Sequence, residues 1–291
     1  MEFYLHVPQL RTSFLELVAR AREAERAGFA GMTVMDHLAA PFVAKQPVYE
    51  AMSCAAWLAA KTERLRVGHL VLAEGYRHPA LLAQQTVSLD HASGGRFDLG
   101  IGSGSVPAEY TVIGFGDPSP SARVRRLHEL LEVLKALWTG EEFDYDGEFY
   151  RLRGARQLPP PLGPIPIVIG GVGPRILPIV AEHAAWWNIP SNYLARLDDL
   201  QGQVGRARVS VLQIVAHVAT ESVRDEVRST AHHRFGQWGE GIVVGNTREL
   251  ADYFERLQAR AVERVYVWFT DAAPPSTIAA FGDVVALFAS T

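Results

Sequence analysis

The fold is decided by residues 21–37, which read AREAERAGFAGMTVMDH. Apolar residues at helical spacing, among them Ala21 and Ala24, lead to Gly28, a residue type that commonly ends helices. Residues 31–36 then form a short apolar run with little alternation. Strands of this kind are typically covered by helices on both faces, as in parallel sheets, so the passage predicts an α/β fold.

The same alternation continues to the end of the chain. The predicted strands are 3–7, 31–36, 65–72, 96–102, 165–169, 185–190, 209–218 and 265–269. A helical pattern follows each strand, and one additional capped helix, beginning at Asn246, precedes the eighth strand. A doubly wound open sheet would alternate in the same way. Eight units in 291 residues, without a strong dinucleotide fingerprint after the first strand, favour a closed (β/α)8 TIM barrel over residues 1–291, with loop insertions.

The composition argues against several classes of partner. The formal net charge is −4, and no basic bias predicts binding to nucleic acid. No window approaches the run of about 18 apolar residues that a membrane span requires. The only cysteine, Cys54, cannot form an intrachain disulfide, and no signal-peptide pattern is visible, so we expect a cytoplasmic protein. No spacing of His, Cys, Asp and Glu resembles a metal site, so no metal ligand is predicted.

Two polar residues end the second predicted strand, Asp36 and His37. Active sites of closed α/β barrels lie at the carboxyl ends of the strands. A histidine there can transfer a proton near neutral pH, and the adjacent aspartate can accept an N–H group from a ligand. The alternative is that both side chains only cap the following loop. The pattern therefore marks His37 as the candidate catalytic residue.

Glycines follow the fourth and fifth predicted strands. In the first of these segments the backbone is open to a ligand above the barrel. In the second, Pro174 is suited to the first position of a helix, and free amides ahead of a helix bind anions, which predicts a phosphate site. Tight turns also use glycine, so both segments could be plain turns. The residues concerned are Gly102, Ser103 and Gly104 in the first segment, and Gly170, Gly171, Val172 and Gly173 in the second.

Several motifs, in their order and spacing, resemble those of the bacterial luciferase-like flavin oxidoreductases over nearly the whole chain. Besides 21–37, the matching segments are 77–80 with Gln84, 94–102, 109–110, 123–138, 147–150, 166–171 and 245–247. Within this family the Asp36-His37 pair is most similar to the branch that uses the deazaflavin coenzyme F420. The resemblance implies an enzyme that transfers a hydride between F420 and a small organic substrate.

The resemblance also implies roles for individual residues. The aspartate that matches Asp36 binds the cofactor, and the histidine that matches His37 gives or takes a proton beside the reactive carbon. A non-proline cis peptide braces the cofactor ring, and counting back from Arg77 places it between His69 and Leu70. The implied cofactor-binding residues are Asp36, Leu70, Gly102, Ser103, Gly104, Gly170, Gly171, Val172, Gly173, Trp187 and Asn188.

Three departures argue against one known substrate class. F420-dependent sugar-phosphate dehydrogenases of the family have a glutamate and an asparagine where this chain has Ser105 and Ala108, and a tryptophan where it has Pro41. The alternatives are an FMN-dependent monooxygenase supplied by a separate flavin reductase, and a barrel that binds a flavin without catalysis. Residues 38–48 and 103–120 are the expected lids. Relatives commonly form homodimers, and the oligomeric state stays open at this point.

Overall fold

Eight parallel strands form a closed barrel in the computed structural model, which describes residues 1–40, 46–112 and 114–289. Each predicted strand is present, and the predicted TIM barrel is confirmed. The ring closes because β1 pairs with both β2 and β12, while β10 pairs with both β9 and β12. The barrel strands, in order around the ring, are β1 (Glu2–His6), β2 (Gly31–Val34), β3 (Arg66–His69), β5 (Phe97–Gly102), β8 (Ile167–Gly170), β9 (Trp186–Pro190), β10 (Arg208–His217) and β12 (Val262–Phe269).

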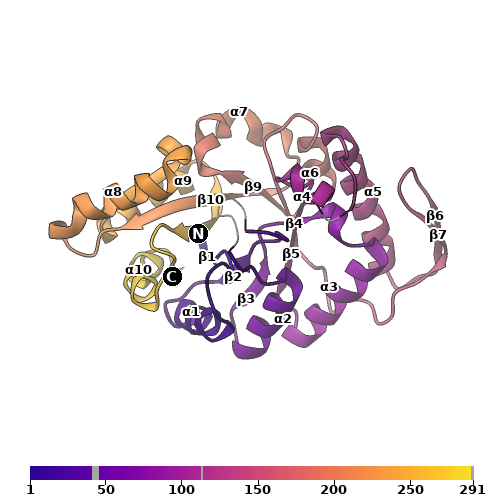
Figure 1. Ribbon diagram of the computed structural model, residues 1–291, viewed down its shortest axis with the longest axis horizontal. Helices are drawn as coiled ribbons and strands as arrows, with labels where there is room; N and C mark the ends of the chain where they lie inside the picture. The colour runs from indigo at the N-terminus through magenta and orange to yellow at the C-terminus, as the bar shows by residue number, and fades with distance from the viewer. Residues whose placement is uncertain (41–45, 113, 290–291) are drawn as a thin grey trace.

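Helices surround the strands, as Figure 1 shows. Outward-facing strand residues and the apolar faces of these helices form the main core. The helices are α1 (Phe14–Arg26), α2 (Ala51–Lys61), α3 (Pro79–Ser93), α5 (Pro120–Trp138), α6 (Leu177–His183), α7 (Leu197–Leu200), α8 (Arg224–Phe235), α9 (Thr247–Ala259) and α10 (Pro275–Leu287). No helix of the described ranges is both long enough and apolar enough to span a membrane.

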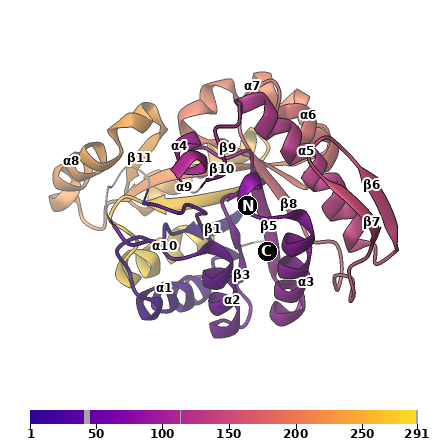
Figure 2. The same cartoon turned by 45° about the vertical axis from the view of Figure 1, so that its right-hand side comes forward.

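Four short strands and one short α-helix were not predicted as separate elements from the sequence. An antiparallel hairpin of β6 (Phe143–Asp146) and β7 (Arg151–Ala155) projects from the barrel beside α5 (Figure 2). Strand β4 (Leu72–Ala73) continues β3 and pairs with β5. Strand β11 (Ile242–Gly245) pairs with the second half of β10, and α4 (Pro107–Val112) lies in the segment after β5.

Two expectations about the backbone are corrected. The non-proline cis peptide joins Leu70 to Val71, one bond later than expected. The Leu70 amide, before this bond, donates to the Val34 carbonyl at 2.9 Å. The helix expected at 194–204 has a single α-helical turn, α7, because neighbouring amides bond three residues back and form 3-10 turns.

A charged network closes the amino-terminal half of the barrel interior. The Asp98 carboxylate accepts hydrogen bonds from Arg66 Nε at 2.9 Å and Arg264 Nη1 at 3.0 Å, and Tyr4 donates its hydroxyl to it at 2.9 Å. The Arg264 guanidinium also stacks over the Trp186 ring, 3.8 Å from its centroid. Because each charge has a partner, these side chains fill the amino-terminal half of the barrel interior. A ligand is therefore expected at the carboxyl ends of the strands.

Candidate active site

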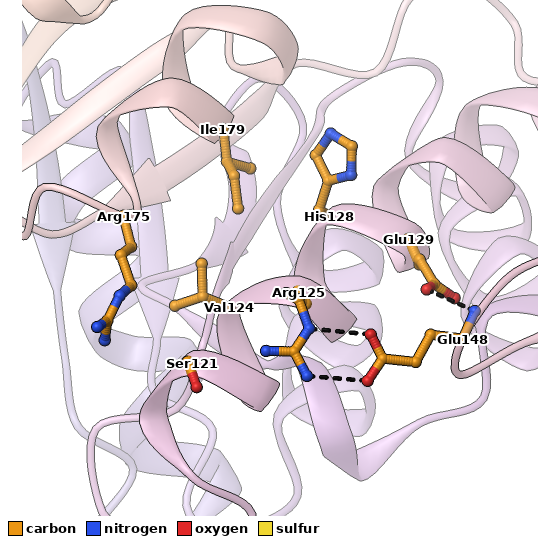
Figure 3. A pocket seen from close by; sticks show the side chains of 8 residues that line it. All are labelled: Ser121, Val124, Arg125, His128, Glu129, Glu148, Arg175 and Ile179. Carbon is orange, nitrogen blue, oxygen red and sulfur yellow. Dashed lines mark hydrogen bonds and ion pairs between the residues drawn. The ribbon is translucent and has the colours of Figure 1, made fainter.

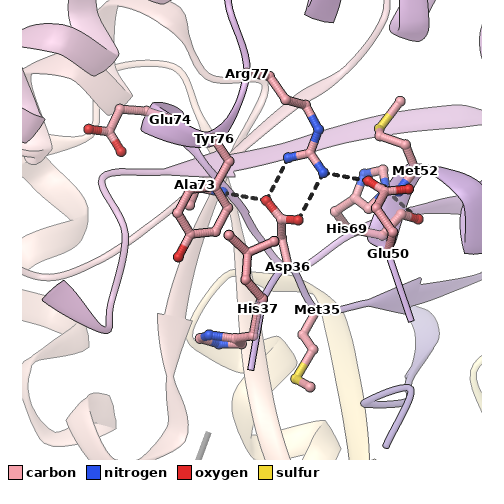
Figure 4. Close-up of polar contacts among 12 residues, drawn as sticks. Met35, Asp36, His37, Glu50, Met52, His69, Ala73, Glu74, Tyr76 and Arg77 are labelled. Atoms are coloured by element: carbon pink, nitrogen blue, oxygen red, sulfur yellow. Dashed lines mark hydrogen bonds and ion pairs between the residues drawn. The ribbon is translucent and has the colours of Figure 1, made fainter. Parts of the chain in front are cut away.

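The Asp36 carboxylate follows β2 and is almost fully buried, with 5% of the residue exposed. Arg77 binds it with two hydrogen bonds, of 2.7 Å and 2.9 Å, and the Ala73 amide donates to Oδ2 at 3.0 Å (Figure 4). Three donors therefore hold the carboxylate. The structure gives Asp36 a positioning role, and direct contact with a cofactor, which the resemblance implies, stays a proposal.

Arg77 extends this network to α2. Its Nη2 donates to Glu50 Oε1 at 2.6 Å, and Glu50 caps α2 by accepting from the amides of Met52 and Ser53. Burial alone would raise the pKa of Glu50, but these amides and the Arg77 guanidinium hold it at about 2. The ends of β2 and β4 and the start of α2 are thus tied together through one guanidinium.

His37 is oriented by Glu109, which α4 places beside it and which is 8% exposed. Glu109 Oε2 accepts from His37 Nδ1 at 2.9 Å and from the Tyr76 hydroxyl at 2.8 Å. Glu109 Oε1 accepts from the amides of Leu38 and Ala39 at 3.1 Å and 3.2 Å. The Tyr76 hydroxyl and the two amides are donors, which favours Glu109 as an acceptor only; with Glu109 accepting, Nδ1 carries the proton and Nε2 is the basic atom. No described residue forms a hydrogen bond with that Nε2.

Tyr76 remains a hydrogen-bond donor to this carboxylate. Burial, followed by the hydrogen bond to Glu109 and the negative charge of that residue, raises the pKa of the Tyr76 phenol well above its usual range. A neutral phenol donates without adding charge, so it helps to keep Glu109 ionised beside His37.

A second buried pair supports the loop after β5. Tyr110 donates its hydroxyl to Glu74, whose pKa is raised, because burial outweighs this bond and the nearby Arg126. Gly104 packs against the same tyrosine: its φ is +75°, and a Cβ there would lie 2.5 Å from the Tyr110 hydroxyl oxygen. The Ser103 carbonyl accepts from Arg123 Nε at 3.0 Å. Gly102 touches the bend after β3, where a Cβ would lie 2.9 Å from Val71 Cγ2. Packing explains both glycines.

The segment after β8 has backbone amides without partners. Gly171 donates to the Asn188 carbonyl at 3.2 Å, but the amides of Val172 and Gly173 donate to no acceptor in the described part of the chain. A Cβ at Gly173 would have no atom within 4 Å, so a ligand could approach the backbone closely. Pro174 was expected at the first position of the helix, but it lies before the helix begins. The Gly173 carbonyl accepts from Ile176 and forms a turn first, and α6 begins at Leu177.

The other residues implied by the resemblance lie on both faces of the barrel wall. Leu70 is 9% exposed and packs inside the barrel with Tyr4 and Trp186. Asn188 also lies inside, where its Nδ2 donates to Ser210 Oγ at 3.2 Å. Trp187 is fully buried in the outer core, and its Nε1 donates to the Gly171 carbonyl at 2.8 Å. It supports the glycine segment from behind, so a direct contact with the cofactor stays a proposal.

Sequence reasoning assigned no role to several residues of this site. Glu109 and Arg77 belong to the motifs on which the resemblance rests, and this membership was the only sign in the sequence that they matter. No feature of the sequence indicated Tyr76.

His6, another residue without a predicted role, ends β1. Its position in the alternation of that strand places it inside the barrel, where Nδ1 lies 3.0 Å from Thr33 Oγ1. Burial, and then the neighbouring His37, lowers the pKa of His6 to about 3, so its imidazole is neutral.

Comparisons with known proteins agree with this architecture. The family described as luciferase-like monooxygenase matches residues 4–262, and the chain belongs to it. An uncharacterised protein of Mycobacterium tuberculosis is 30% identical over 228 residues, which are 70% of this chain and 78% of that protein. An F420-dependent glucose-6-phosphate dehydrogenase of Nocardia farcinica is 37% identical over 174 residues, 58% of this chain and 50% of that enzyme. The match to that enzyme therefore covers only half its length.

Solved structures with the same fold include both deazaflavin enzymes and oxygenases. An F420-dependent secondary alcohol dehydrogenase superposes with a TM-score of 0.84 at 16% identity, covering 97% of each chain. The EDTA monooxygenase of Chelativorans sp. BNC1 also has a TM-score of 0.84, at 14% identity, covering 99% of this chain and 91% of that one. At such identities the likeness concerns the fold and does not determine the cofactor.

Proposed function

We propose that the chain is an oxidoreductase that transfers a hydride between coenzyme F420 and a small organic substrate at the carboxyl ends of the barrel strands. The placement of His37 carries the proposal: Nδ1 donates to an ionised Glu109, and Nε2 has no hydrogen-bond partner among the described residues. An imidazole held in this tautomer can accept a proton at Nε2. His37 therefore moves the proton that accompanies the hydride.

The chain offers suitable groups for a planar ring with a phosphate tail. Leu70 presents an apolar side chain inside the barrel, against which a ring can lie. The free amides of Val172 and Gly173 can donate to a phosphate, and no side chain blocks Gly173. Gly170 is similarly open, since a Cβ there would have only the Asn188 carbonyl within 4 Å, at 3.9 Å. These positions support a ring inside the barrel end and a tail at the segment after β8.

Bound F420 would supply the hydride acceptor or donor, chemistry that no side chain can provide. The chain's residues handle the proton. In the oxidation of an alcohol, the substrate O–H bond breaks and its proton passes to His37 Nε2. The Glu109 carboxylate, 2.9 Å from Nδ1, stabilises the imidazolium that results. Tyr76 and the amides of Leu38 and Ala39 fix that carboxylate, so the imidazole does not have to reorient during turnover.

An FMN-dependent monooxygenase is the second candidate, because the matching family is described as luciferase-like monooxygenase and a solved structure of the same fold, a Baeyer-Villiger monooxygenase, is a complex with FMN. The amides of Val172 and Gly173 could bind the phosphate of either cofactor. A flavin-binding barrel without catalysis would have no need for a histidine oriented by a buried carboxylate, which argues against that alternative.

Titration of the purified chain with F420 and with FMN separates the two enzymes. We expect tighter binding of F420, followed by anaerobic loss of its visible absorbance when alcohols of graded size are added. Tighter binding of FMN, together with oxygen consumption in the presence of its reduced form, would contradict the F420 assignment and support the monooxygenase. Tight binding without either reaction would support the non-catalytic barrel.

A further inference from the structure

A cluster of ligand-type side chains lies between α5 and α6, on the outer surface of the barrel. His128 comes from α5, and Glu182 and His183 come from the end of α6. One ligand atom of each residue lies within 4.8 Å of the other two. We propose that these three side chains bind a divalent transition-metal ion of the Zn²⁺ class. The proposal is independent of the redox function, because none of the three residues belongs to the site around His37.

The distances suit such an ion. His128 Nε2 lies 3.1 Å from Glu182 Oε2, and His183 Nε2 lies 3.4 Å from Glu182 Oε1. Tetrahedral zinc with bonds of 2.0–2.1 Å separates its ligand atoms by about 3.3 Å. Two histidines and one carboxylate form a common ligand set for this ion. Small rotations of exposed Glu182 and half-buried His128 would complete the geometry.

His183 supplies an independent indication of a ligand. Its side chain is only 4% exposed, yet neither ring nitrogen has a hydrogen-bond partner in the described ranges. A buried polar atom without a partner destabilises a fold, and coordination of an ion would satisfy one of these nitrogens.

Glu132 is placed to orient His128, as a second carboxylate commonly does for a metal-binding histidine. It lies one helical turn after His128, and its Oε2 is 3.8 Å from His128 Nδ1, the nitrogen that does not face Glu182. Tyr145 holds Glu132 by donating its hydroxyl at 2.6 Å. Metal-binding histidines commonly direct their second nitrogen to a carboxylate, which orients the ring. Lys135, with Nζ 3.5 Å from the Glu182 carbonyl, places an opposing positive charge nearby and would limit the affinity.

The ion would have an open coordination position. His128 lines a cavity of about 480 Å³ between α5 and α6, which Figure 3 shows together with the Arg125–Glu148 pair and Arg175. Of the three ligands only His128 lines this cavity, and three protein ligands leave a fourth tetrahedral position for water or an exogenous anion. The ion would also join α5 to α6, so its binding would stabilise the folded chain.

Cobalt(II) is the direct probe, since tetrahedral Co²⁺ absorbs visible light. The full chain, without an affinity tag and after removal of metals with a chelator, is titrated with Co²⁺ and then with Zn²⁺ in competition. We expect one saturable Co²⁺ site with a visible spectrum that Zn²⁺ abolishes. His128→Gln and Glu182→Gln, both at accessible positions, should weaken binding by more than about 100-fold, and Glu132→Gln by about 10- to 100-fold.

The matched control is His233→Gln, which removes an exposed histidine of α8 that has no place in the cluster. This variant should bind Co²⁺ like the unaltered chain. Zn²⁺ should raise the Tm of the unaltered chain and of His233→Gln, but not that of His128→Gln. Absence of saturable binding, or equal binding by His128→Gln and the control, would overturn the proposal.

Discussion

Glu109 Oε2 lies 2.9 Å from His37 Nδ1 and is held there by Tyr76, while Glu109 Oε1 binds the Leu38 and Ala39 amides. The carboxylate thus fixes both the ring of His37 and the backbone that follows it. A carboxylate that accepts all four of these hydrogen bonds cannot be replaced by an amide without a mismatch. This relationship determines which nitrogen of His37 is available for chemistry.

Glu109→Gln should slow turnover strongly while leaving cofactor affinity nearly unchanged. If the amide oxygen keeps the Leu38 and Ala39 N–H groups, its NH2 group faces His37 Nδ1 and favours the tautomer with the proton on Nε2. The expected loss in kcat is about 10²- to 10⁴-fold, the usual contribution of a positioned proton-transfer group. Steady-state kinetics across pH would measure it.

Tyr76→Phe is the matched control for that variant, since it removes one of the four donors to Glu109 and leaves the carboxylate in place. Its kcat should fall less than that of Glu109→Gln. Equal losses in the two variants would show that the charge of Glu109 has no special role.

Arg77→Met should destabilise the fold, because it leaves the buried Asp36 carboxylate without its charged partner. Breaking a buried ion pair from one side typically costs about 3–5 kcal/mol of unfolding free energy. Arg125→Met is the control: it breaks an exposed pair with Glu148, for which about 0–1 kcal/mol is usual. Urea denaturation compares the two, and a similar small loss in both would contradict the structural role of Arg77.

Gly104→Ala should weaken cofactor binding in addition to its effect on stability. A Cβ there would press on the Tyr110 hydroxyl and displace the loop beside the barrel end. Gly94→Ala is the control, because Gly94 also has a positive φ, of +66°, but no atom within 4 Å of the added Cβ. Both variants should lose about 1 kcal/mol of stability from the strained φ, and only Gly104→Ala should lose affinity for F420. Equal affinities would contradict the placement of the cofactor near this loop.

Stability should fall as the pH decreases from about 6.5 to about 3, in part through His6. The unfolded chain protonates this histidine near pH 6.5, whereas the folded chain holds its pKa at about 3. The stability from its neutral form is therefore complete above pH 6.5 and is lost as the pH falls. His6→Gln should reduce the slope of unfolding free energy against pH by about 1.4 kcal/mol per pH unit within this window. An unchanged slope would contradict the burial of a neutral His6.

The barrel could be predicted from sequence because its pattern is local. Strands covered on both faces read as short, mainly apolar runs, and capped helices such as α1 and α9 carry recognisable boundaries. The β6–β7 hairpin escaped prediction, since its strands are mostly exposed and short. The cis peptide was misplaced by one bond, since it was counted back along the sequence from Arg77 and nothing local fixes its position.

The site was predictable only in part, for a similar reason. Asp36 and His37 were visible because they end a strand that the pattern defines. Their partners were not, since Arg77 lies 41 residues from Asp36 and Glu109 lies 72 residues from His37. Nothing in the local sequence near Glu109 indicates that a six-residue helix would direct it toward β2.

The central claim, that His37 moves a proton in a reaction between F420 and a small substrate, is tested most directly by His37→Gln. The measurement is F420 affinity by titration, together with single-turnover hydride transfer under anaerobic conditions. The structure predicts nearly unchanged affinity, because Glu109 retains three other donors and the site stays folded, with the rate reduced about 10²- to 10⁴-fold. An unchanged rate in a variant that still binds F420 would contradict the account.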